Sequence, residues 1–136
     1  MMTDVFAGTW ELNPQRSEFD PNHRPRQGTM EFEKDGEAYV LKARGVSGKG
    51  EPVTENHQRL VPDGQPYPVP GLPGLTAICT RRDPNAISAE VRREDGTLAG
   101  QAEYVVSPDG RSLAATTSGF DTQLRQFRQY TVWDRK

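Results

Sequence analysis

Four Asp-Gly pairs, spread along a chain of 136 residues, place the strongest constraint on how this sequence can fold. Glycine accepts a positive φ without steric cost and aspartate tolerates the left-handed region, so the dipeptide favours tight hairpin turns. Three of the four pairs separate runs that alternate apolar and polar residues with period two, as half-buried strands do. The sequence therefore predicts turns at Asp35-Gly36, Asp63-Gly64, Asp95-Gly96 and Asp109-Gly110, and the three pairs that separate such runs are expected to join successive antiparallel hairpins.

About nine or ten strands are expected, at the spacing of roughly 8–12 residues that is typical of all-β sandwiches and barrels. The clearest are 38–44, 87–92, 98–106, 113–117 and 127–133; the runs 29–32 and 76–80 are weaker, and the polar run 53–61 is interpreted as an edge or mixed strand. Two proline-rich segments, 13–26 and 65–74, are predicted to be loops at a rim, because proline cannot donate to a β-ladder. No stretch has the periodicity of a long amphipathic helix.

Length and charge exclude several classes of protein. Residues 1–136 are expected to form one domain with a thin core, since only 33% of them are hydrophobic. The 17 basic and 19 acidic residues nearly cancel, which gives no general attraction for nucleic acid or for an anionic membrane. No run approaches the roughly 20 apolar residues of a membrane span. The N-terminus lacks the features of a signal peptide, so we expect a cytoplasmic protein unless a signal has been removed.

The sequence offers little for catalysis or metal binding. With two histidines and one cysteine, a three-histidine zinc site and an internal disulfide are both impossible. His23 is interpreted as a surface residue of a basic loop, His57 lies in a polar strand and could face inward, and Cys79 is interpreted as a small buried hydrophobe. Because no nucleophile motif or phosphate-binding loop occurs, we assign no catalytic residue, metal or cofactor and expect a protein that is not an enzyme.

The first strand carries the motif that identifies a possible family. Residues 5–12, VFAGTWEL, resemble the opening strand of the calycins, which are the lipocalins and fatty-acid-binding proteins, and residues 131–135, TVWDR, are similar to the last strand of such barrels. The layout is more similar still to small uncharacterised bacterial lipocalin-like proteins. The residues that carry this likeness are Gly8, Thr9, Trp10, Leu12, Asn13, Ser17, Phe19, Tyr67, Pro68, Val69 and Gly71.

This resemblance implies an all-β fold, an antiparallel up-and-down β-barrel of about 8–10 strands. A closed barrel has no exposed edge, which suits a chain of short strands with few apolar residues. In the resembling families a tryptophan closes one end of the barrel and a basic residue from the last strand often lies across it. Here Trp10 would be that tryptophan, and Arg128 or Arg125 would be the basic residue. The prolines between the first two strands argue against a helical lid.

The fatty-acid-binding proteins also hold a carboxylate with an Arg-x-Tyr pair near the C-terminus, and two registers are open for that pair here. Alignment of the final aromatic-acid-base sequence puts Thr131 and Trp133 at those positions and loses the arginine. A literal match selects Arg128 and Tyr130. We prefer the first register. Arg128 and Tyr130 share a strand face in either case, as a buried anion clamp or, by default, as part of a solvated ladder of opposite charges.

The preferred function is that of a binding protein, monomeric or homodimeric, with an apolar or amphipathic ligand in a barrel cavity. Small residues expected on inward faces, such as Ala43, Ala89 and Ala102, would leave room for such a ligand. The alternatives are a barrel filled by its own side chains, acting as a structural or protein-interaction module, and, less favoured, a barrel enzyme. The candidate ligand-binding residues are Arg128, Tyr130, Tyr39, Leu41, Tyr104 and Tyr67.

Overall fold

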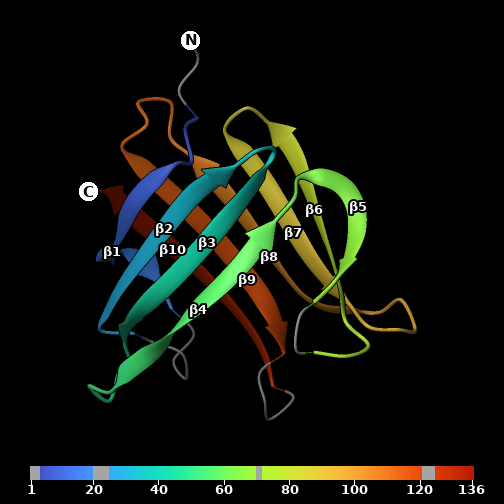
Figure 1. Cartoon of the computed structure of the whole chain (residues 1–136). Helices are drawn as coiled ribbons and strands as arrows, with labels where there is room; N and C mark the ends of the chain where they lie inside the picture. Colours follow the sequence, from blue (N-terminus) through green and yellow to red (C-terminus); the bar gives the residue numbers. More distant parts are fainter. Residues whose placement is uncertain (1–3, 20–24, 70–71, 121–124) are drawn as a thin grey trace.

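The computed structural model describes residues 4–19, 25–69, 72–120 and 125–136, and only the backbone of residues 53–56. None of these residues is helical, and they form a single ten-stranded antiparallel sheet (Figure 1). The strand order in the sheet is β4-β3-β2-β1-β10-β9-β8-β7-β6-β5. The strands are β1 (Gly8–Glu18), β2 (Gln27–Asp35), β3 (Ala38–Val46), β4 (Pro52–Leu60), β5 (Asp63–Pro68), β6 (Thr76–Asp83), β7 (Ala86–Arg92), β8 (Leu98–Val106), β9 (Ser112–Phe120) and β10 (Gln126–Arg135).

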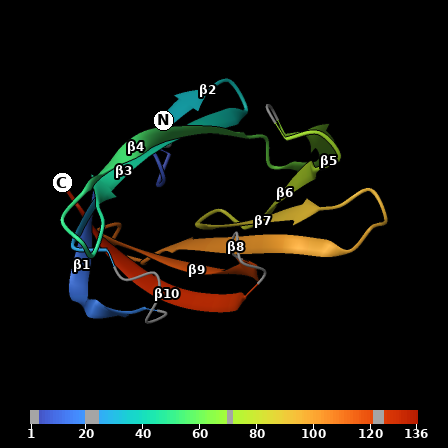
Figure 2. The same ribbon diagram turned by 90° about the horizontal axis from the view of Figure 1, so that it is seen from below.

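The predicted all-β hairpin fold is confirmed, although Asp63-Gly64 begins strand β5 and joins no hairpin with β4. Asp-Gly pairs turn the chain between β2 and β3, between β7 and β8, and between β8 and β9, where Gly36, Gly96 and Gly110 have φ of 61°, 85° and 73°. The sheet curls strongly, so that β2, β3 and β4 lie over β7, β8 and β9 (Figure 2). Among the ladders of the described sheet, the one between β1 and β10 joins strands that are distant in sequence, and the others join consecutive strands. The β1–β10 ladder thus brings together the first and last strands.

The sheet differs from the expected closed barrel in having two edges. In the described part of the chain β4 and β5 are the outermost strands, and no ladder joins them. A physical reason lies in β5, where Pro66 and Pro68 have no N–H to donate and the pairing with β6 shifts register after Asp63. The interpretation of 53–61 as an edge strand is confirmed by β4.

The prediction that both proline-rich segments are loops was wrong in part. β1 continues to Glu18, and β5 includes Gln65–Pro68. Pro14 is tolerated because the β1–β10 ladder is interrupted between Asn13 and Glu18, so that no N–H is required there. The prolines of β5 are tolerated because β5 is an edge strand. Residues 20–24 and 70–71 of the two segments lie outside the described residues.

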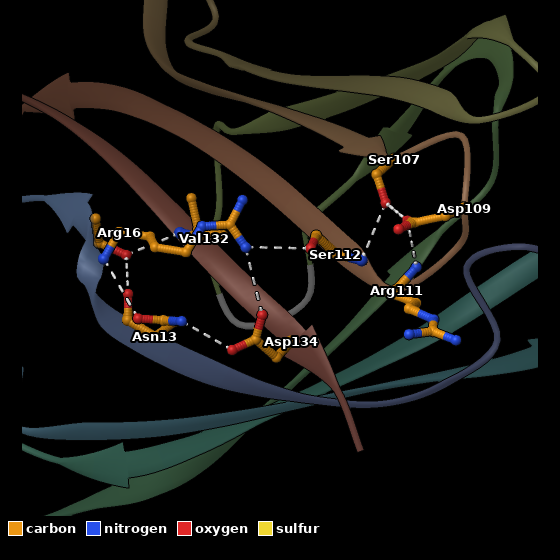
Figure 3. Close-up of polar contacts among 9 residues, drawn as sticks. Asn13, Arg16, Ser107, Asp109, Arg111, Ser112, Val132 and Asp134 are labelled. Atoms are coloured by element: carbon orange, nitrogen blue, oxygen red, sulfur yellow. Dashed lines mark hydrogen bonds and ion pairs between the residues drawn. The ribbon is translucent and has the colours of Figure 1, made fainter.

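Asn13 and Ser17 of the opening motif hold the β1 interruption together. The Ser17 hydroxyl donates to the carbonyl oxygen of Asn13 (2.7 Å) and accepts the N–H of Val132 (2.8 Å), so it stands in the ladder where a backbone carbonyl would. The Asn13 amide donates to Asp134 (2.9 Å), and its oxygen accepts the N–H of Arg16 (Figure 3). These two side chains therefore have a structural role.

Removal of the Ser17 hydroxyl should destabilise the fold. In Ser17→Ala the N–H of Val132, a buried residue, loses its acceptor, and we expect the free energy of unfolding to fall by about 1–3 kcal/mol. Urea unfolding followed by circular dichroism measures the change. Ser17→Thr keeps the hydroxyl and should therefore lose much less stability than Ser17→Ala. Equal losses in the two variants would contradict the role of this hydroxyl in the ladder.

Candidate ligand site

The register of the sheet defines an inner face. Residues opposite each other in an antiparallel ladder project from the same face, and side chains alternate between faces along each strand. The face that we call inner carries a buried cluster concentrated where β1 begins and β2 ends. We call this region the closed end; its main members are Phe6, Trp10, Phe32, Tyr39, Ile87, Tyr104, Val106 and Leu113.

Aromatic rings fill the closed end. The ring centroid of Phe32 lies 5.7 Å from that of Phe6, 6.0 Å from that of Tyr39 and 5.7 Å from that of Tyr104. Phe6 comes from the segment before β1, and its carbonyl accepts the indole N–H of the fully buried Trp10 (3.0 Å). The first few described residues therefore form part of the core.

The cation over Trp10 is Arg135, so the expectation of Arg128 or Arg125 was wrong. The Arg135 guanidinium lies 4.1 Å from the indole centroid and donates to the carbonyls of Ala7 (2.8 Å) and Val5 (2.5 Å). The physical reason is register: Arg135 lies directly opposite Trp10 in the β1–β10 ladder, whereas Arg128 lies beyond the β1 interruption. Arg135 thus ties the N-terminal segment to the closed end.

A polar network that sequence reasoning missed lies beside the aromatic rings. The Tyr39 hydroxyl donates to Asp4 Oδ2 (2.5 Å) and accepts from Arg81 Nη2 (2.6 Å), while Lys34 Nζ lies 3.7 Å from the same Asp4 oxygen. Burial alone would raise the pKa of Asp4. Hydrogen bonds from Tyr39 and from the Phe6 N–H, together with the charge of Lys34, lower this pKa by more than burial raises it. The pKa of Asp4 therefore lies below its ordinary value, and the ionised carboxylate helps to fix the segment before β1.

Two tyrosines should resist ionisation. Burial and the hydrogen bond to Asp4 raise the pKa of Tyr39 to about 12, and burial raises that of Tyr104 to about 12. Because the fold favours the neutral phenols, their contribution to stability is complete below pH 10 and is lost as pH rises towards 12. An alkaline titration of tyrosinate absorbance should show a late step that Tyr39→Phe and Tyr104→Phe each reduce. A late step unchanged in both variants would contradict the assignment.

Beyond the closed end the inner face carries several small side chains, together with the larger Val91 and Phe127. In the ladder Ala89 lies opposite Ala102, and Ala102 lies opposite Thr117. These three residues and Ala43 are only half-buried, although Ala43, Ala89 and Ala102 pack against the edge of the core. We call the region around these four residues the small-residue half. The inner face thus changes from a buried aromatic end to a region of smaller, half-buried side chains.

The structure separates the predicted ligand residues into three groups. Tyr39, Leu41 and Tyr104 lie together on the inner face and are buried in the closed-end core. Tyr67 is 41% exposed on the edge strand β5, and its hydroxyl donates to Asp63 (2.5 Å). A ligand-binding role for these side chains stays a prediction.

Arg128 and Tyr130 are exposed and lie on the outer face, opposite Ser118 and Thr116. They share one face, as predicted. The alternate residues Thr131 and Trp133 face inward, opposite Ala115 and Leu113 of the core, which agrees with the preferred register of the last strand. Their role in binding also stays a prediction.

Arg128 borders an open groove of about 740 Å³ that is lined mostly by outward-facing residues of β6–β10. Arg82 Nε donates to Ser88 (3.1 Å) in this groove, and beside it Arg92 pairs with Glu90 of its own strand (2.9 Å). A cross-strand ladder of opposite charges stays a prediction. The groove is lined by Arg82, Ser88, Ala89, Glu90, Gln101, Ala102, Glu103, Thr116, Ser118, Gln126, Phe127 and Arg128.

The remaining candidate residues of the sequence are His57, His23 and Cys79. His57 is exposed, and its partner Lys42 alternates with the inward-facing Leu41, which places His57 on the outer face. His23 lies outside the described residues. Cys79 is buried, as predicted, and burial raises the pKa of its thiol to about 11. Within the described ranges no group of three His, Cys, Asp or Glu residues could hold a metal ion, and no helix could span a membrane.

Comparison with known proteins defines the class of fold. No protein-family model and no curated protein matches the sequence. The structure is similar to zebrafish ileal bile acid-binding protein in complex with cholic acid (TM-score 0.59, 12% identity, covering 97% of this chain and 99% of that one). It is equally similar to As-p18, an extracellular fatty acid binding protein (TM-score 0.59, 15% identity, 100% and 99% covered). Lobster apocrustacyanin A1 matches at a TM-score of 0.52 and 14% identity, over 97% of this chain and 61% of its own.

The chain therefore has the calycin fold shared by lipocalins and fatty-acid-binding proteins, as its opening motif predicted. In length it matches the bile acid- and fatty acid-binding proteins, whereas it spans about three-fifths of the crustacyanin. At these identities the likeness concerns the fold, and the ligand must be argued from the residues of this chain.

Proposed function

We propose that this protein binds a small apolar or amphipathic molecule on the inner face of its sheet, in the small-residue half. The observation that carries the proposal is the division of the inner face. Large rings are packed at the closed end, whereas Ala43, Ala89, Ala102 and Thr117, which register places on the inner face, are small and only half-buried. A concave apolar surface with a few polar groups is the usual form of a small-molecule site.

The structural neighbours support binding rather than catalysis. Two of them are binding proteins, for a bile acid and for fatty acids. Two described groups near the inner face, Tyr39 and Cys79, are poorly suited to act as a base or nucleophile. Tyr39 is held between Asp4 and Arg81, and the buried Cys79 thiol has a raised pKa.

The proposal is tested by filling the small-residue half. Ala102→Phe places a ring on the inner face, and we expect the affinity for a fluorescent apolar probe to fall at least about tenfold, because the ring and the probe compete for one volume. Fluorescence titration of delipidated protein measures the affinity.

The matched control is Gln101→Phe, which adds the same ring to the next residue on the outer face, where Gln101 is exposed. This variant should bind the probe as the parent does, and circular dichroism should show that both variants are folded. Equal binding by the parent and by folded Ala102→Phe would place the probe elsewhere and contradict the proposal.

An interaction module remains the second candidate, favoured by one observation. Strand β5 is exposed along its whole length and forms a sheet edge in the described chain, with Tyr67 and the nearby Leu72 exposed by 41% and 53%. Such an edge can pair with an extended segment of another protein. Failure of the parent protein to bind any apolar probe would favour this candidate.

A further inference from the structure

The cations of the inner face lie at its closed end. In the described part of the ten strands, the basic residues whose register places them on the inner face are Lys34, opposite Tyr39; Arg81, opposite Ile87; and Arg135, opposite Trp10. Tyr39, Ile87 and Trp10 are fully buried members of the closed-end core. No inward-facing cation therefore reaches the small-residue half from these strands.

Each of these cations already has partners. Arg81 donates to the Tyr39 hydroxyl and to the Pro84 carbonyl (3.1 Å). Lys34 lies beside Asp4 and 4.7 Å from the Tyr39 ring centroid. Arg135 is held by the Trp10 ring and by backbone carbonyls. All three cations therefore lie at the closed end and not beside the alanines of the small-residue half.

The small-residue half offers neutral polar groups instead. In the ladder Thr117 lies opposite Ala102 on one side and Gln129 on the other, so a hydroxyl and an amide project from the inner face beside the alanines. Both residues are half-buried. The Thr117 hydroxyl can donate to or accept from an alcohol, ketone or ester, and neither it nor the uncharged Gln129 amide neutralises a carboxylate.

Arg128 and Tyr130 of the last strand add no positive charge to the inner face. Arg128 and Tyr130 are exposed on the outer face, so a ligand on the inner face would have the sheet between it and the guanidinium. Arg125 is also exposed and precedes β10 at the rim, outside the ladder. It is therefore a residue for the test and not part of the proposed site.

We infer that the ligand is an uncharged apolar molecule with a hydroxyl or carbonyl group, of the neutral-lipid type, and not a fatty acid or bile acid anion. This inference rests on the proposed function. Its physical basis is that desolvating an unpaired carboxylate costs far more than burying a neutral polar group that finds one hydrogen bond.

The test compares a long-chain alcohol, its methyl-ester counterpart and the fatty acid of the same chain length, each displacing a fluorescent apolar probe near neutral pH. We expect the alcohol and the ester to bind at least about tenfold more tightly than the acid. An acid that binds as tightly as the alcohol would overturn the inference while leaving the proposed function intact; if Arg125→Ala then removes that binding, the anion site lies at the rim. If the probe does not bind the parent, the proposed function itself fails, and the inference fails with it.

A second measurement locates the polar contact. Thr117→Val keeps the shape of the side chain and removes the hydroxyl. The affinity for the alcohol should therefore fall about three- to tenfold, and the affinity for the apolar probe should stay unchanged. Ser118→Ala, the adjacent change on the outer face, is the control and should alter neither affinity. Loss of alcohol affinity in Ser118→Ala but not in Thr117→Val would overturn the assignment to the inner face.

Discussion

Phe32→Ala is expected to lower the free energy of unfolding by about 3–5 kcal/mol, a large part of the stability of a domain of this size. Phe32 is 1% exposed and touches three other rings, from Phe6, Tyr39 and Tyr104. These rings come from three separate parts of the chain. A cavity at this point therefore loosens the N-terminal segment, the β2–β3 hairpin and β8 together.

Urea unfolding followed by far-ultraviolet circular dichroism measures this loss. The matched control is Phe120→Ala, because Phe120 is 45% exposed at the end of β9 and its ring contacts the Arg93 guanidinium at 5.7 Å. The control should change stability by less than about 1 kcal/mol. A loss in Phe32→Ala no larger than that in the control would show that the closed-end cluster is not the core of the fold.

Gly45→Ala is expected to destabilise the fold by about 1–3 kcal/mol or more, through a backbone clash and not through a lost contact. Gly45 lies opposite Gly28 in the β2–β3 ladder. A methyl group here would collide with the carbonyl oxygen of Gln27 and lie 3.1 Å from the Cα of Gly28. Both atoms belong to the backbone, so the two strands would have to move apart at this point of the ladder.

Gly100→Ala provides a control in a similar setting. Gly100 lies opposite Gly119 in the β8–β9 ladder, and its added methyl would meet the carbonyl oxygen of Ser118 at 3.3 Å, which a small shift can relieve. Thermal unfolding of the two variants should show the larger loss in Gly45→Ala. Equal losses would mean that glycine is needed at these sites for backbone freedom and not for space.

The hairpins were predictable because their causes are local. Asp-Gly turns and period-two alternation act within a few residues, and Gly36, Gly96 and Gly110 have the positive φ that such turns require. The edge role of 53–61 also follows from local polarity. The prediction of loops at 13–26 and 65–74 was wrong in part because Pro14 lies at a ladder interruption and Pro66 in an edge strand, where a strand tolerates proline. Both of these are properties of the whole sheet and not of the local sequence.

The candidate site was predictable in its residue types but not in its arrangement. Alternation indicated that Ala89 and Ala102 share a face, and the ladder places them opposite each other on the inner face. Alternation also put Arg128 and Tyr130 on one face, but it could not say which face that is. A shift of one residue moves every side chain of a strand to the other side, and only the β10 pairing of Thr131 and Trp133 with core residues decides it.

The sequence by itself determined an antiparallel meander of short strands, because turn chemistry and alternation depend on neighbours in the chain. Only the tertiary structure decided which half of the inner face is filled. The closed end requires Tyr39 to meet Asp4 and Arg81, which are 35 and 42 residues away, and Arg135 to meet Trp10 across the ladder of the two chain ends. Such contacts depend on the curl and register of the whole sheet, which no local pattern encodes.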